Sequence, residues 1–133
     1  MPETKIEYGD GELVERIKTF VIPGETLHAV FRCRGIGASI VGITDQRVIF
    51  RDQGVLLQKK AMLSIPYNQV IGAAIEDEGS GTLGANELTL ITAAGLFAFE
   101  FQEAEEALWA YRFIMDQILN QPQPQLRDKA GWG

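Results

Sequence analysis

The sequence predicts a mainly β (α+β) fold, an antiparallel barrel of about seven strands with a C-terminal amphipathic helix as its cap and a short N-terminal helix. Through much of residues 25–101 apolar side chains alternate with polar ones, a period of two that is typical of half-buried strands. Turn-forming residues separate these segments at hairpin spacing. From Glu103 the apolar period becomes helical. An antiparallel sheet closed by one helix accounts for these three observations.

The N-terminal half is expected to hold a helix and four strands. Residues 10–22 have helical apolar spacing, with Asp10 before the first turn, and Pro23-Gly24 ends the helix. The period of two predicts strands over residues 25–32, 38–44, 47–51 and 55–65. The expected turns lie at residues 34–37, 44–46 and 52–54.

The C-terminal half is expected to hold three strands and the capping helix. The strands are residues 70–75, 87–92 and 96–101, and a polar loop begins at Glu76. The helix spans residues 103–120, and its main apolar stripe should fill the open end of the barrel with Leu108, Tyr111, Met115 and Ile118. The expected organisation is a helical extension over residues 1–23, one domain over 24–120 and a flexible tail over 121–133.

Several short motifs resemble a known family in their order and spacing. They are Pro23-Gly24-Glu25, GITDQRVIF at 42–50, QKKAMLSIPYNQVIGAAIED at 58–77 and ELTLITAAGLFAFEF at 87–101. Together these motifs resemble the bacterial pleckstrin-homology-like domains and their GRAM-like relatives, over about residues 24–119. The resemblance implies a pleckstrin-homology-like barrel that acts as a binding module. It also implies homo-oligomers, which members of these bacterial families form.

Composition excludes several classes of function. The net charge of −6 disfavours nucleic-acid binding, which depends on accumulated positive charge. Cys33 is the only cysteine and His28 the only histidine, and a strand would point them to opposite faces. We therefore expect no disulfide, no metal site, no cofactor and no catalytic residues, so the chain is not expected to be an enzyme.

Positive charge is concentrated in residues 32–60, which have a local balance of +4. Pleckstrin-homology domains that bind phosphoinositides place basic residues around the first hairpin, and the resemblance therefore suggests an anion or lipid site. Its candidate residues are Arg32, Arg34, Arg51, Lys59 and Lys60. The alternative is that these residues are solvated charges at strand edges.

The motif residues also have structural interpretations. Thr44 and Asp45 have side chains that can accept hydrogen bonds from backbone N–H groups of a turn, and Arg47 could pair with an acid across that turn. Tyr67 can bury its ring and leave its hydroxyl at the surface.

Trp109 and Phe113 are the candidate interface residues. They lie four apart and about 160° from the main stripe of the C-terminal helix, where they would form an exposed aromatic patch. In the alternative, both rings are covered by Leu13, Ile17 and Phe20 of the N-terminal helix.

The sequence therefore favours a non-enzymatic module that binds a protein partner or a second copy of itself. The alternative is peripheral binding to anionic lipid through the basic residues. The lone thiol and the lack of an apolar leader predict the cytoplasm, with peripheral membrane attachment if the lipid alternative holds.

Overall fold

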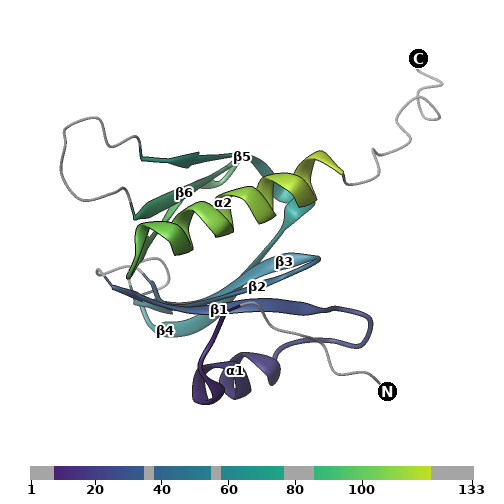
Figure 1. Cartoon of the computed structure of the whole chain (residues 1–133), viewed down its shortest axis with the longest axis vertical. Coiled ribbons are helices and arrows are strands. Elements are labelled where there is room, and N and C mark those ends of the chain that lie inside the picture. The colour runs from purple at the N-terminus through teal and green to yellow at the C-terminus, as the bar shows by residue number, and fades with distance from the viewer. Residues whose placement is uncertain (1–7, 35–37, 55–57, 77–85, 121–133) are drawn as a thin grey trace.

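The computed structural model of the chain describes residues 8–34, 38–54, 58–76 and 86–120 (Figure 1). This part of the chain contains two α-helices, α1 (Gly11–Lys18) and α2 (Ala104–Leu119), and the 3-10 helix η1 (Tyr67–Gln69). Its seven strands are β1 (Leu27–Arg34), β2 (Ala38–Thr44), β3 (Arg47–Gln53), β4 (Lys60–Pro66), β5 (Val70–Ile75), β6 (Glu87–Thr92) and β7 (Gly95–Phe101).

The strands are antiparallel and follow the order β4-β3-β2-β1-β7-β6-β5. We call β1–β4 the first sheet and β5–β7 the second sheet. The two sheets are joined where Cys33 pairs with Phe101 and Arg34 pairs with Glu100. In Figure 1, α2 runs between them, on the inner side of the second sheet. This arrangement confirms the predicted fold class.

The main core fills the space between the two sheets and α2. Leu88 and Leu90 on β6, and Phe99 and Phe101 on β7, point into it with the alternation that the sequence predicts. The buried residues of α2 are Ala107, Ala110 and Ile114. Leu108 was expected in the open end of the barrel, but 42% of it is exposed, so this expectation is wrong.

A second, smaller core lies on the outer face of the first sheet, under α1. The carboxylate of Asp10 caps this helix by accepting the Leu13 N–H at 3.0 Å. Ile17 packs close to β2, where a Cβ on Gly42 would lie 2.7 Å from its Cγ2. The members of this core are Leu13, Val14, Ile17, Leu27, Val30, Ile40 and Ile49. The expected domain boundary at residue 23 stays a prediction, but α1 packs directly on the first sheet.

Two element boundaries differ from the prediction. Helix α1 ends at Lys18. The Phe20 and Val21 N–H groups donate to carbonyls three residues back, which is the hydrogen-bond pattern of a tighter 3-10 turn and not of an α-helix. Strand β4 begins at Lys60, where pairing with Gln53 of β3 starts, so Gln58 and Lys59 of the predicted strand precede it. The predicted turn at 34–37, the start of the expected 55–65 strand, most of the polar loop and the tail at 121–133 lie outside the described residues.

Candidate functional site

The turn between β2 and β3 is held by the side chains that the sequence singled out. Thr44 Oγ1 accepts the N–H groups of Gln46 and Arg47, both at 2.9 Å. Asp45 Oδ1 accepts the Thr26 N–H at 2.9 Å, which ties the turn to the start of β1. Both side chains therefore hold backbone donors, as expected.

Arg47 has the expected acidic partner, but that partner is Glu25, which precedes β1. Arg47 Nε donates to Glu25 Oε2 at 2.7 Å and Nη2 donates to Oε1 at 2.9 Å, which makes a bidentate pair. The guanidinium also donates to Ser64 Oγ of β4 at 2.9 Å and to the Phe20 carbonyl at 2.6 Å. One side chain thus joins the α1–β1 connection to β3 and β4.

The Glu25 carboxylate is buried, with 1% of its side chain exposed. It also accepts hydrogen bonds from Thr44 Oγ1 at 2.7 Å and from the Ile22 N–H at 3.1 Å. Burial works to raise the pKa of Glu25, but the hydrogen bonds from Arg47, Thr44 and Ile22 outweigh it and lower the pKa to about 2. A carboxylate with this pKa stays ionised at neutral pH, so it has no proton to donate there.

Tyr67 supports the same turn from η1. Its ring is buried, and its hydroxyl donates to the Thr44 carbonyl at 2.8 Å. The expectation that the hydroxyl reaches the surface is therefore wrong, because the hydroxyl has a buried backbone acceptor. Burial, followed by the charges of Asp45 and Glu25, raises the pKa of Tyr67.

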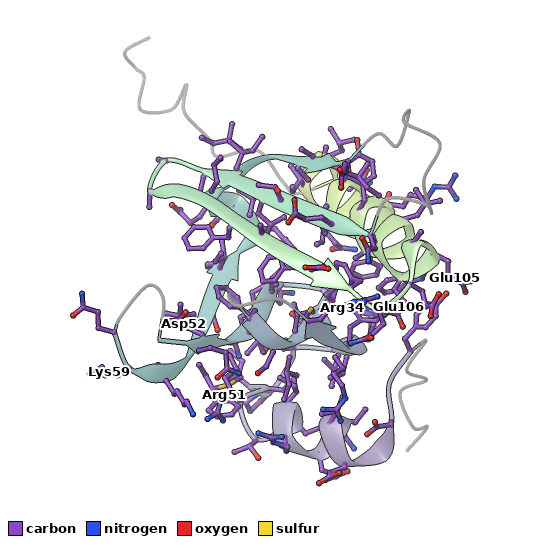
Figure 2. The ribbon with its side chains drawn as sticks, turned by 90° about the vertical axis from the view of Figure 1, so that its left-hand side faces the viewer. Arg34, Arg51, Asp52, Lys59, Glu105 and Glu106 are labelled. Atoms are coloured by element: carbon purple, nitrogen blue, oxygen red, sulfur yellow. The ribbon has the colours of Figure 1, made fainter. Side chains whose placement is uncertain are left out.

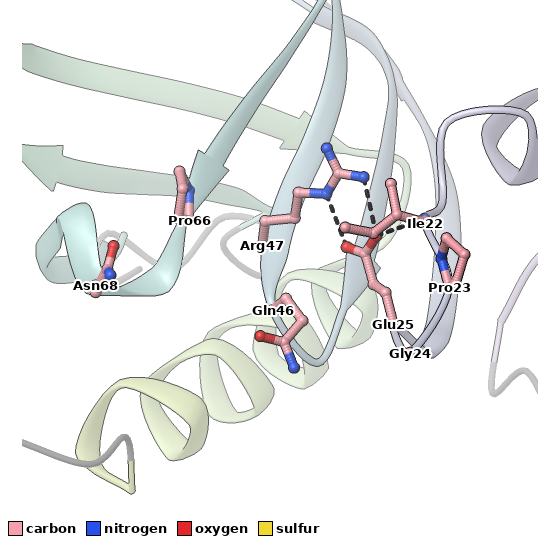
Figure 3. A pocket seen from close by; sticks show the side chains of 8 residues that line it. All are labelled: Ile22, Pro23, Gly24, Glu25, Gln46, Arg47, Pro66 and Asn68. Carbon is pink, nitrogen blue, oxygen red and sulfur yellow. Dashed lines mark hydrogen bonds and ion pairs between the residues drawn. The ribbon is translucent and has the colours of Figure 1, made fainter.

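A cleft of about 420 Å³ opens beside this network. Figure 3 shows the Glu25 carboxylate and the Arg47 guanidinium facing each other in it. The side chains around the pair are mostly apolar or neutral. The lining residues are Ile22, Pro23, Gly24, Glu25, Gln46, Arg47, Pro66 and Asn68. Because each charge of the pair already has its partner, the cleft offers no free ion to a ligand.

The structure does not bring the five predicted basic residues into one patch. Arg32 lies 4.0 Å from Asp10, and Arg34 pairs with Glu100 at 3.9 Å and donates to the Gln102 carbonyl at 3.2 Å. In the view of Figure 2, Arg34 lies toward the same side of the molecule as Glu105 and Glu106, while Arg51 and Lys59 lie toward the other side.

The remaining three basic residues differ from Arg32 and Arg34 in their partners. Arg51 is on β3, Lys60 begins β4 and Lys59 directly precedes β4. Within the described residues, none of these three side chains has an ion pair. An anion site on this chain would therefore rest on Arg51, Lys59 and Lys60.

Trp109 and Phe113 lie in an aromatic cluster, and the expected exposed patch is not there. Both rings are half-buried and pack against the main core, with their centroids 5.1 Å apart. Phe31 and Tyr8 cover Trp109, and His28 covers Phe113. The N-terminal helix does not cover them, so the alternative named the wrong partners. A role at an interface stays a prediction.

His28 and Cys33 lie on the same side of β1, which corrects the expectation of opposite faces. A bulge between Leu27 and Ala29 shifts the alternation, so His28 meets Phe113 of α2 while Cys33 joins the main core. Five residues of strand, about 17 Å, still separate them. Burial, then the charges of Glu106 and Glu100, raises the pKa of the Cys33 thiol to about 12. This pair cannot act as a nucleophile and base.

The outer face of the second sheet is a surface that the sequence analysis missed. Ile71 and Leu96 expose 69% and 67% of their surface, and Ile91 exposes 36%. Ile91 pairs with Leu96 and with Gly72, and the register shift between Val70 and Gly72 places Ile71 as the extra residue of β5 opposite Ile91. The sequence held a signal for this surface, because Ile91 and Leu96 are out of phase with the buried positions Leu90 and Phe99.

In the part of the chain that the structure describes, no group of three or more His, Cys, Asp or Glu side chains is placed to hold a metal ion. Over the same residues, no helix has the length and apolar character needed to cross a membrane.

Comparisons with known proteins identify the fold. No family model and no curated protein matches the chain. A solved pleckstrin-homology domain from Shewanella amazonensis aligns with 83% of this chain and 98% of its own, at 22% identity and a TM-score of 0.62. A DUF1696 family protein with a pleckstrin-homology domain, from Shewanella loihica, aligns with 80% of this chain and 91% of its own, at 23% identity and a TM-score of 0.60.

A third solved structure extends this likeness beyond bacteria. It is the C-terminal domain of an unknown protein from Leishmania infantum, which covers 80% of this chain and 99% of its own length, at 23% identity and a TM-score of 0.55. The chain therefore has a pleckstrin-homology-like fold, as its motifs predicted. A relation to the GRAM-like domains stays a prediction.

Proposed function

We propose that this chain is a non-catalytic binding module that holds a protein partner, or a second copy of itself, on the outer face of the second sheet. The observation that supports this proposal is the exposed aliphatic row Ile71, Ile91 and Leu96. Exposed apolar patches of this kind are typical of interaction sites. The lone histidine is packed on Phe113 and the lone cysteine is buried with a raised pKa, which favours a non-catalytic role.

The solution mass tests the self-associating form of this proposal. Light scattering at micromolar concentration would show an oligomer that Leu96→Ser dissociates, because the substitution removes apolar contact area without touching the core. Leu119→Ser is the matched control, since Leu119 is equally exposed, at 72%, but lies at the end of α2. An oligomer that survives Leu96→Ser would place the contact elsewhere, for instance at Trp109 and Phe113.

The second candidate function is peripheral binding to anionic lipid, and it is favoured by the charges of Arg51, Lys59 and Lys60, which have no ion pair among the described residues. Sedimentation with phosphatidylserine-containing vesicles would then show binding that weakens as salt rises. Lys59→Glu with Lys60→Glu should abolish it. The control is Arg16→Glu with Lys18→Glu, which changes the net charge equally on α1. Equal loss in both double variants would indicate a general charge effect and contradict a local lipid site.

A further inference from the structure

The outer face of the second sheet is organised in three rows that cross its strands. Ile71, Ile91 and Leu96 form the apolar row at the end next to the β6–β7 turn. Thr89 pairs with both Ala74 and Ala98, which makes a middle row of small side chains. The third row is acidic. Glu87 pairs with Glu100, and the Glu76 N–H donates to the Glu87 carbonyl at 3.3 Å, so its members are Glu76, Glu87 and Glu100.

No described element covers this face. The core and α2 lie on the opposite side of the second sheet, where Leu88, Leu90, Phe97 and Phe99 point. Figure 1 shows α2 on the inner side of β5 and β6, with neither of the two described α-helices beyond them. A face that carries three exposed aliphatic side chains and small neighbours is open to a partner that brings its own apolar surface.

The first sheet indicates which kind of element covers an outer face in this fold. Its cover, α1, is an amphipathic helix that presses Leu13, Val14 and Ile17 onto the strands, and Gly42 leaves room for Ile17. The middle row of the second sheet leaves similar room, because Ala74 and Ala98 are small. An extended peptide would add to a sheet edge through backbone hydrogen bonds, whereas a helix lies on a face.

The acidic row determines the charge of the partner. Neither Glu76 nor Glu87 has an ion pair among the described residues, while Glu100 lies 3.9 Å from Arg34 with both side chains well exposed. Such an exposed pair is weak, so the row keeps most of its negative charge. Four residues of strand separate Glu87 from Ile91, about 14 Å, and the positions of a helix that return to the same face nearest this distance lie about seven or eight residues apart, about 11–12 Å along its axis.

We propose that this face docks an amphipathic helix of another protein that has apolar side chains on one turn and Lys or Arg about seven or eight residues further along, on the same face of the helix. The proposal rests on the function proposed above and adds the chemistry of the partner. The apolar turn of the partner covers Ile71, Ile91 and Leu96. Its basic residues lie against Glu76 and Glu87.

The test uses a defined helical probe and the whole chain. The probe is a fluorescein-labelled alanine-based peptide with leucines on one turn and lysines about seven or eight residues further along, on the same face of the helix. A second peptide has glutamates in place of the lysines, and a third has serines in place of the leucines. Fluorescence anisotropy should show that the lysine peptide binds at least about tenfold more tightly than either of the others.

Two variants of the chain localise the binding. Leu96→Ser should weaken binding of the lysine peptide about tenfold or more. Glu87→Lys should weaken binding of the lysine peptide similarly and strengthen binding of the glutamate peptide. Leu119→Ser and Glu105→Lys are the matched controls, because both residues are exposed on α2, and they should leave affinity unchanged. All four positions are exposed, so unchanged melting curves are expected to confirm folding.

The outcomes separate this proposal from the function on which it rests. Equal affinity for the lysine and glutamate peptides, with both lost in Leu96→Ser, would overturn the charge assignment but keep the face as a docking surface. A homo-oligomer that Leu96→Ser dissociates and that binds no peptide would make a second copy the occupant. No peptide binding by a monomer would contradict this proposal and the protein-binding function together.

Discussion

The first sheet is covered on both faces, whereas the second sheet is covered on one. Outward-facing Val30, Ile40 and Ile49 of the first sheet are buried under α1, and outward-facing Ile91 and Leu96 of the second sheet meet solvent. Both outer faces carry aliphatic side chains, so composition alone does not determine which face is buried. The difference comes from topology, because the chain supplies a helix to one sheet and none of its described elements to the other.

The Glu25–Arg47 pair stabilises the first sheet and its cover α1, because it holds the connection from α1 to β1 in place. We expect Arg47→Met to reduce the free energy of unfolding by about 3–5 kcal/mol, since it leaves a buried carboxylate without its cation. Urea unfolding measures this loss. Arg34→Met is the matched control, because the Arg34–Glu100 pair is exposed and should cost less than about 1 kcal/mol.

A further variant distinguishes the unpaired charge from lost packing. Glu25→Gln combined with Arg47→Met removes both charges, and we expect it to be less destabilising than Arg47→Met alone. A double variant as unstable as Arg47→Met would show that the stability loss comes mainly from lost packing of the guanidinium and not from the unpaired carboxylate.

Acid should reduce the stability of the protein through the same carboxylate, Glu25. The pKa of Glu25 is lowered from 4.5 to about 2, so its contribution is fully present above pH 4.5 and is lost as the pH falls toward 2. The contribution is about 3 kcal/mol by linkage. Glu25→Gln should therefore be less stable than the natural chain at pH 7, with the difference shrinking in acid. Parallel stability curves over this range would contradict the lowered pKa.

The smallest expected effect compares one isoleucine from each outer face. Ile17→Val should cost about 1 kcal/mol, because the lost methylene leaves a gap in a closed core. Ile91→Val should stay within about 0.5 kcal/mol, because its site is open to solvent. Thermal unfolding of the two variants makes the comparison. Equal losses would mean that the outer face of the second sheet is covered in solution.

Local patterns were sufficient to predict most of the fold. The alternation of Leu88 and Leu90, and of Phe97, Phe99 and Phe101, identified the second sheet, and the turn at Thr44 was recognised from side chains that bond to neighbouring backbone. The pairing of Arg47 with Glu25 was not predictable in the same way. Glu25 lies 22 residues earlier in the sequence, and only the folded chain brings it to the turn.

The prediction of which α2 residues are buried was wrong at Leu108 because of residue size. The predicted stripe gave weight to large apolar residues such as Leu108, but the helix approaches the sheets through Ala107 and Ala110, which permit close packing. Trp109 and Phe113 then flank this narrow contact and are half-buried. Likewise, the bulge at Leu27–Ala29 moved His28 to the other face, and no local signal marked it.

The buried position of Cys33 gives this chain an intrinsic reporter of its own opening. It is the only thiol, it is 6% exposed, and its pKa of about 12 leaves almost no thiolate at neutral pH. An alkylating reagent can therefore react with Cys33 only when β1 and β7 separate at the pairing of Cys33 with Phe101. The rate of labelling would follow the population of that open state, so it would measure in unmodified protein how often the two sheets part.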